Sequence, residues 1–428
     1  MACLNDTWTG AARAGMMTIL LVSACGDRAA TGSPRIRDSA GVQIVENVAV
    51  AGPDAWTVSE PAQVDIGGGG GHPAYDFNAV TNVLRFPDGR IVVANRSTNE
   101  IRIFDSLGAH LKTVGRAGGG PGEFQSLIAA WRGPGDSLLA ADILSRRLSV
   151  FDTEGNFVRS FGLGGETGLP MPTAGTLQFA IPQGWLRDGS VVGIAQGFRF
   201  NDAREGIYRD SQAVIRYSPD GTAGDTLGRF PGAEMEQVQL SFRGQTMSIP
   251  QPVPLGRLAV FLVEDTQLFV ARNEGWQVEV YVMDGRLARL IRVEAPEVRI
   301  TEADQAAHRE EQLAAIESQP ETRNVPEAIK EQIVSRVKNA AYPATMPLIA
   351  GLLRDSEGNL WVQQWPRPGE RANRFTVLDS TGAAVGHATM PDRFRATAIG
   401  NGVVAGVWRD PDDVEHVRVY RLRRAGGS

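Results

Sequence analysis

The stretch that decides the fold runs from Val80 to Gly115 and reads VTNVLRFPDGRIVVANRSTNEIRIFDSLGAHLKTVG. A second copy, from Leu127 to Gly162, reads LIAAWRGPGDSLLAADILSRRLSVFDTEGNFVRSFG. Each copy contains four short apolar stretches separated by Gly, Asp, Asn and Ser, which predicts a four-stranded antiparallel meander with tight turns. A lone sheet of this kind would leave an apolar face in water, so the copies must pack on one another.

Weaker copies follow at residues 185–221, 258–285, 352–382 and 396–422. The last of these has no clear fourth strand. One of two apolar stretches near the N-terminus, 42–48 or 62–66, can supply that strand and close a ring. The sequence therefore predicts an all-β fold, a six-bladed β-propeller of four-stranded antiparallel blades, with five or seven blades as the alternatives.

The repeats also carry a family resemblance. FPDGRIVVAN with IRIFDSLG, and LLAAD with LSVFDTEG, resemble the blades of six-bladed propellers of the NHL and TolB-like group. The linker from Gly115 to Phe124 resembles the GxPGEF connection between blades in that group. The resemblance covers residues 60–423 and is sharpest over 80–162. It implies a fold and no single activity, because propellers include hydrolases, lyases and binding platforms.

Between Thr301 and Ala341 the apolar period changes from two to that of a helix. Ile329, Ile333 and Val337 recur every four residues, and Thr301 stands three residues before Asp304, as in an N-terminal cap. We expect two helices, 302–317 and 326–340, in an insertion (301–341) between blades four and five. The insertion is either a lid or partner arm, or a flap packed permanently on the rim.

The N-terminus has the order of an export signal. Arg13 precedes the apolar run MMTILLV (16–22), which is followed by small residues and Cys25. The sequence LVSAC resembles a bacterial lipobox, which implies acylation of Cys25 and a lipid anchor at the outer membrane or periplasmic face of the cell envelope. We therefore expect a signal peptide (1–25), a flexible tether (26–40) and a propeller (41–428). The alternative is an unmodified cysteine in a disordered tail.

Composition excludes several function classes. The 428 residues carry a formal net charge of −6 without a basic cluster, which opposes nucleic-acid binding. The only cysteines are Cys3 and Cys25, so the predicted propeller has no disulfide, zinc-thiolate site or cysteine nucleophile. The five histidines lack the spacing of a metal pair. No cofactor is expected, with Ca²⁺ as the less favoured possibility.

Polar residues at the ends of the second strands are the candidate site, because those ends point to one face of a propeller near its central channel. The candidates, with two on the linker before blade two, are Asn95, Arg96, Arg116, Glu123, Asp142, Gln196, Arg272, Asn273, Gln363, Gln364, Arg409 and Asp410. They are either a polar funnel for a ligand or a solvated rim with scattered ion pairs.

This mixture of arginine, amide and acid favours binding over metal catalysis. The sequence predicts a cell-envelope propeller that binds or scaffolds a protein, peptide or glycan. The alternatives are an NHL-like or gluconolactonase-like hydrolase or lyase that uses the channel face, and a scaffold without any small-molecule site.

Overall fold

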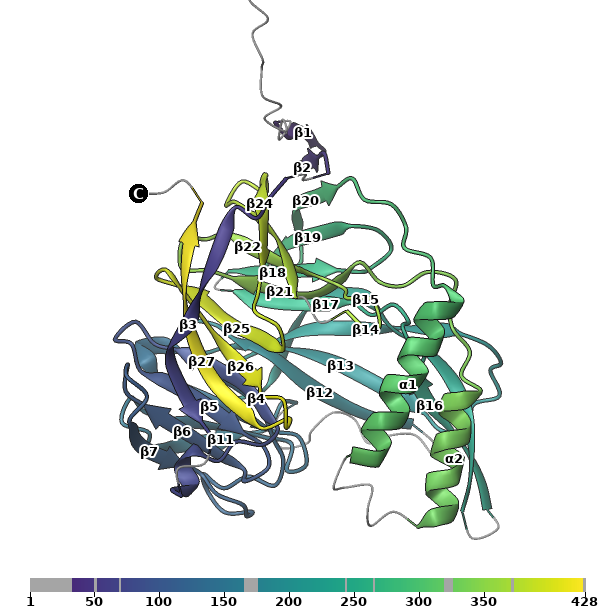
Figure 1. Ribbon diagram of the computed structural model, residues 1–428, viewed down its shortest axis with the longest axis horizontal. Coiled ribbons are helices and arrows are strands. Elements are labelled where there is room, and N and C mark those ends of the chain that lie inside the picture. The colour runs from purple at the N-terminus through teal and green to yellow at the C-terminus, as the bar shows by residue number, and fades with distance from the viewer. Residues whose placement is uncertain are drawn as a thin grey trace, which may run out of the picture. The chain divides into compact units, whose positions relative to one another are not determined.

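The computed structural model describes residues 33–49, 52–68, 71–164, 176–242, 245–264, 266–318, 326–370 and 373–425. The predicted signal peptide, its acceptor Cys25 and the first residues of the predicted tether lie outside these ranges. The described chain is mostly β-strand (Figure 1).

Two regular four-stranded meanders form from the two clearest repeats. The first has the order β4-β5-β6-β7 and the second β11-β10-β9-β8. Their strands are β4 (Val80–Arg85), β5 (Ile91–Asn95), β6 (Glu100–Phe104), β7 (His110–Val114), β8 (Leu127–Arg132), β9 (Leu138–Asp142), β10 (Arg147–Phe151) and β11 (Phe157–Phe161). Gly155 shows why such turns require glycine: its φ is +75°, and a Cβ there would lie 2.7 Å from Val114 of the first meander.

The third and fourth meanders are larger. The third sheet has the order β12-β13-β14-β15-β16, and the fourth has the order β1-β2-β20-β19-β18-β17. Their strands are β1 (Arg35–Ser39), β2 (Val42–Asn47), β12 (Thr176–Trp185), β13 (Val191–Arg199), β14 (Tyr208–Tyr217), β15 (Ala223–Phe242), β16 (Gln245–Pro252), β17 (Val260–Glu264), β18 (Gln267–Ala271), β19 (Gln277–Val282) and β20 (Leu287–Val293).

Strand β1 lies inside the stretch predicted to be a tether. It pairs with β2 through a two-residue turn, with Ser39 opposite Val42 and both turn residues, Ala40 and Gly41, at positive φ. This turn geometry matches the twist of a β-hairpin. Strand β2 in turn adds parallel to the outer edge of β20.

The fifth and sixth meanders share one eight-stranded sheet, in the order β21-β22-β23-β24-β3-β27-β26-β25. Its strands are β3 (Trp56–Gly67), β21 (Ile349–Arg354), β22 (Leu360–Gln364), β23 (Arg374–Leu378), β24 (Ala384–Thr389), β25 (Phe394–Gly400), β26 (Val403–Arg409) and β27 (Glu415–Arg424). Of the two N-terminal stretches, it is β3 that pairs antiparallel with β27. Its contact with β24 is a single parallel bridge, between Trp56 and Ala388.

Buried apolar side chains connect these meanders in sequence order. Within the described ranges, separate clusters join the first to the second, the second to the third, the third to the fourth, the fourth to the fifth and the fifth to the sixth. A further cluster joins the sixth back to the first. The sheets therefore bury their faces against one another in a cyclic order.

Two helices lie in the chain between β20 and β21: α1 (Glu302–Ser318) and α2 (Glu327–Lys338). At the start of α1 the Asp304 backbone N–H donates to Thr301 Oγ1 at 3.2 Å, and the Thr301 N–H donates to Asp304 Oδ2 at 2.8 Å. This reciprocal cap satisfies amides that the first turn leaves unpaired. The helices lie beside each other, and Arg336 of α2 donates to Gln251 of β16 at 3.1 Å (Figure 1).

The pairing of β3 with β27 can be tested by a disulfide between Val64 and Val419, which are opposed in the register. Opposed residues of antiparallel strands lie at distances that a disulfide spans. In a background lacking Cys3 and Cys25, we expect V64C/V419C to oxidise and to gain about 2–4 kcal/mol in free energy of unfolding over its reduced form. Mass spectrometry and urea denaturation measure both.

The matched control is V64C/R418C. Residue 418 neighbours 419 and projects to the opposite face of the strand, so this pair should stay reduced. Equal oxidation of both variants would contradict the register.

Candidate functional site

The candidate residues lie where second strands end. Asn95, Asp142 and Arg409 are the last residues of β5, β9 and β26. Gln363 lies one residue before the end of β22, and Arg272 directly follows β18. These strands belong to different meanders.

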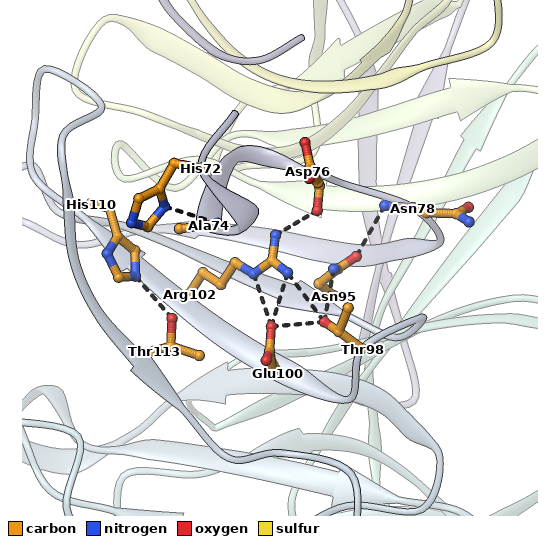
Figure 2. Close-up of polar contacts among 10 residues, drawn as sticks. All are labelled: His72, Ala74, Asp76, Asn78, Asn95, Thr98, Glu100, Arg102, His110 and Thr113. Atoms are coloured by element: carbon orange, nitrogen blue, oxygen red, sulfur yellow. Dashed lines mark hydrogen bonds and ion pairs between the residues drawn. The ribbon is translucent and has the colours of Figure 1, made fainter. Parts of the chain in front are cut away.

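Asn95 is fully buried and bonds to the neighbouring loops (Figure 2). Its Oδ1 accepts a hydrogen bond from the Asn78 backbone N–H at 3.2 Å, and its Nδ2 donates to Thr98 Oγ1 at 3.0 Å. The amide thus ties the loop after β5 to the segment that enters β4.

Beside it, Figure 2 shows a buried arginine that sequence reasoning did not select. Arg102 of β6 is 2% exposed and donates to Glu100 Oε2 at 2.9 Å and to the Asp76 carbonyl at 2.5 Å. Its guanidinium also lies over the Phe77 ring, 5.6 Å from the centroid. Since its charge is paired with Glu100, this arginine anchors the entering segment.

His72 and His110 come together at the outer end of this network, with ring centroids 6.0 Å apart (Figure 2). His110 Nε2 lies 2.9 Å from Thr113 Oγ1. Burial, with a smaller contribution from the charges of His72 and Arg102, lowers the pKa of His110. The two histidines are 38 positions apart, so their proximity had no signal in local spacing.

Asp142 is 3% exposed, and its carboxylate is occupied by backbone amides. Oδ2 accepts from Gln125 N–H at 2.6 Å, and Oδ1 accepts from Ser126 N–H at 3.1 Å. Oδ1 also accepts from Leu144 and Ser145 N–H at 3.0 and 3.2 Å. Burial alone would raise the pKa of Asp142, but these hydrogen bonds outweigh it and lower the pKa.

Other meanders also have a buried polar side chain that accepts hydrogen bonds from backbone N–H groups. Asn273 Oδ1 accepts from Ile349 N–H at 2.9 Å, which joins the fourth meander to the fifth. Glu415, 5% exposed, accepts from Val80 N–H at 2.7 Å, which joins the sixth to the first. Glu415 was missed because it is the first residue of the third strand β27, whereas Asn95 and Asp142 are the last residues of second strands. The sequence signal that could have identified it was an acidic or amide residue at the end of an apolar strand.

The linker candidates Arg116 and Glu123 form an ion pair, with Arg116 Nε 2.7 Å from Glu123 Oε1. Glu123 Oε2 also accepts from Gly120 N–H at 2.8 Å. That bond, and then the pairing with Arg116, lower the pKa of Glu123. The Arg116 side chain stays 77% exposed.

Three further candidates have partners within their own meander. Arg272 donates to Glu279 Oε2 at 2.9 Å, and Arg409 donates to Glu415 Oε1 at 2.9 Å while remaining 55% exposed. Gln363 Nε2 donates to Asn373 Oδ1 at 3.1 Å.

Two further candidates differ in setting. Arg96 is exposed, directly after β5. Gln196 is half-buried in β13, opposite Phe179. Of the twelve candidates, Arg116 and Glu123 are the one pair whose side chains bond to each other among the described residues.

Helix α1 is fixed to the loop that follows β22. Arg367 donates to both oxygens of Asp304, at 2.9 and 2.8 Å, and Gly369 N–H donates to Glu311 at 2.7 Å. His308 Nδ1 lies 3.0 Å from the Tyr342 hydroxyl. The helix is therefore tied to the edge of the sheets where Gln363 lies.

In the described ranges, His, Cys, Asp and Glu side chains form no group of three or more that could hold a metal ion. Over the same ranges, no helix combines the length and hydrophobicity needed to cross a bilayer. Among the groups that this edge presents to solvent are the exposed guanidinium groups of Arg96, Arg116 and Arg409, beside exposed acids such as Glu274 and Asp413. The guanidinium groups suit electrostatic and bidentate binding of carboxylates.

Changing Asp142 to Asn should lower the free energy of unfolding by about 1–3 kcal/mol, because an amide N–H₂ would face the Gln125 N–H donor. The lowered pKa of Asp142 means that its contribution is complete above the unfolded-state pKa, about 3.9, and is lost as the pH falls through the folded-state value. Urea denaturation of the wild-type protein and D142N, from about pH 2.5 to about pH 7, measures this difference in free energy of unfolding.

The exposed Asp284 provides the control. D284N should cost under about 0.5 kcal/mol at neutral pH. A D142N deficit that stays constant with pH would contradict the role assigned to the carboxylate.

The comparisons with known proteins concern the fold. A family model described as "6-bladed beta-propeller" matches residues 76–131, a segment that contains the first meander. None of the curated proteins compared matches this sequence.

Three solved structures are similar. A Bacteroides fragilis protein designated as exported aligns over 89% of this chain and 99% of its own, at 11% identity and a TM-score of 0.48. A duf4221 family member from Bacteroides vulgatus aligns over 92% and 100%, at 9% identity and a TM-score of 0.44. The calcium-binding protein regucalcin from Agrobacterium tumefaciens aligns over 88% and 97%, at 14% identity and a TM-score of 0.36.

Proposed function

We propose that this chain is an exported, lipid-anchored, six-bladed β-propeller that binds an acidic peptide or glycan partner at the edge where its second strands end. The count of six rests on the cyclic order of the apolar clusters, each of which joins one meander to the next. In this interpretation β3 is the outer strand of the sixth blade, and the two helices form an insertion between blades four and five.

The binding proposal rests on a difference between two groups of polar residues at this edge. The acids and amides at the strand ends, such as Asp142 and Asn95, already accept hydrogen bonds from backbone N–H groups. A carboxylate that accepts four amide hydrogen bonds is a poor general base and a poor metal ligand. The exposed arginines are groups at this edge that can meet a partner, and they retain N–H donors for its carboxylates.

The anchor proposal rests on Leu21 to Cys25. Acyl chains on Cys25 would hold the propeller at a membrane surface, since two or more chains give stable attachment. A binding protein in the cell envelope meets peptidoglycan, whose glycan strands carry peptides with free carboxylates. Peptidoglycan therefore serves as the first probe of the binding edge.

Purified peptidoglycan sacculi test the binding edge by cosedimentation. We expect the wild-type protein to pellet with sacculi and to dissociate as salt rises, because the contacts are between exposed charges. R96A/R116A should reduce the bound fraction at least about fivefold. R286A removes another exposed arginine, from the turn between β19 and β20 at the opposite strand ends, and should leave the bound fraction unchanged.

Two outcomes would overturn this assignment. One is equal retention of R96A/R116A and the wild-type protein. The other is no retention of the wild-type protein on sacculi or on an array of acidic peptides and glycans. Release of soluble fragments from the sacculi, detected by mass spectrometry, would instead favour the hydrolase or lyase alternative.

Cys25→Ser tests the anchor separately. Expressed in a Gram-negative host, the wild-type chain should incorporate radiolabelled palmitate and fractionate with membranes, whereas C25S should do neither. Membrane association of C25S equal to that of the wild-type chain would contradict the lipid anchor without affecting the binding proposal.

A further inference from the structure

A pocket lies at the junction of the fourth and fifth meanders, away from the candidate site. It is lined by residues at the start of β18, on β20, at the end of β21 and on the two turns of the fifth meander: Gln267, Phe269, Arg289, Ile291, Arg354, Gly358, Leu360, Asp379 and Ser380. Gln267 and Leu360 begin β18 and β22, whereas Arg272 and Gln363 lie at the other ends of those strands. The pocket is therefore at the opposite edge of the sheets.

Two arginines face this pocket with most of their donors unused. Arg289 Nη1 donates to the Ser380 carbonyl at 2.7 Å, and Arg354 Nη1 makes a long contact, 3.4 Å, with Gln267 Oε1. The Arg354 guanidinium also lies over the Phe269 ring, 5.1 Å from its centroid. In the described part of the chain, neither guanidinium has a carboxylate oxygen within 4.0 Å.

The charge around the pocket is unbalanced. Asp379 is the acidic residue that lines it, and its Oδ1 is already held by the N–H groups of Thr381 and Ala383 at 2.8 and 3.0 Å. Two half-buried guanidinium groups thus face one carboxylate. Burial and repulsion from Arg354 lower the pKa of Arg289. A cationic pair faced by a single carboxylate is costly unless a further anion shares the site.

The repeats show that this imbalance is not needed for the fold. Arg289 occupies the register position that Lys112 has in the first meander, directly after the irregularity in the strand pairing. Lys112 also bonds to the next turn, donating to the Glu154 carbonyl at 2.7 Å. A cation on the fourth strand therefore has a structural role, which a single lysine fulfils.

The second arginine lies at a register position that is also basic in the first and second meanders, where Arg85 and Arg132 stand. Arg354 pairs in register with the first residue of β22, as Arg132 does with the first residue of β9. Arg132 is neutralised by Asp136 at 2.6 Å. The turn after Arg354 offers no such partner, because the Asp355 carboxylate accepts from Asn359 N–H at 2.8 Å and from Trp361 Nε1 at 2.9 Å.

From these contacts we infer that the pocket between β18, β20 and β22 binds an oxyanion, a phosphate or carboxylate group held between Arg289 and Arg354. Planar guanidinium groups bind such anions with paired hydrogen bonds. The cavity volume is about 80 Å³. A cavity needs roughly 10–15 Å³ to hold one water molecule, so this one has room for a phosphate or carboxylate group.

Isothermal titration with inorganic phosphate, at ionic strength kept constant with sodium chloride, tests the site in the full chain. We expect saturable one-to-one binding, and an increase in Kd of at least about tenfold for R354Q and R289Q. The matched controls K112Q and R132Q remove cations from the equivalent register positions and should leave the Kd unchanged. Parallel titrations with acetate and succinate distinguish carboxylate from phosphate ligands.

Chemical modification provides a readout that needs no variant. Phenylglyoxal modifies accessible arginines, and mass spectrometry locates the products. Phosphate, or whichever of acetate and succinate binds more tightly, should protect Arg354 and Arg289 from modification in the wild-type protein. Arg132 should remain unprotected. The inference is overturned if neither phosphate nor carboxylates bind more tightly than chloride, or if protection and Kd do not depend on these two arginines.

Discussion

A four-stranded meander with apolar residues on both faces is stable only between two others, and this constraint governs the whole chain. The clusters of buried side chains satisfy it by joining each meander to its neighbours in a cyclic order. The pairing of β3, from near the N-terminus, with β27, from near the C-terminus, contributes Val64 and Ile66 to the cluster that closes this order. Closure also removes the exposed edge that β27 would otherwise present.

The regular parts of this fold were accessible from sequence because their signals are local. The first two meanders have a turn residue at each reversal, and Thr301 with Asp304 forms the reciprocal cap that marks the start of α1. The third copy was weaker in sequence, and its sheet departs from the four-stranded pattern because a fifth strand, β16, pairs with the long strand β15. The parallel addition of β2 to β20 joins segments about 245 residues apart, for which local pattern has no signal.

For the candidate site, too, the sequence predicted some features and had no signal for others. Sequence alignment of the repeats located the ends of the second strands, but it could not say whether a polar side chain there is free. Asp142 is used by its own meander's entry loop, and Glu415 by an amide of the first meander, 335 residues away. Such bonds depend on how successive meanders pack. The residues that repeat alignment identifies most easily are thus the ones that the ring itself requires.

Departures from the repeat therefore say more about ligand binding than the repeat does. A position that holds neighbouring meanders together can carry the same chemistry in different meanders, as Lys112 and Arg289 show by bonding to the turn of the following meander. Arg354 keeps the basic residue found at Arg132 but lacks its carboxylate partner. Stability of the ring favours the neutralised form, since an unpaired charge in a half-buried site lowers stability. At Arg354 the unpaired charge shares a pocket with a second guanidinium, that of Arg289, and an anion would complete this site.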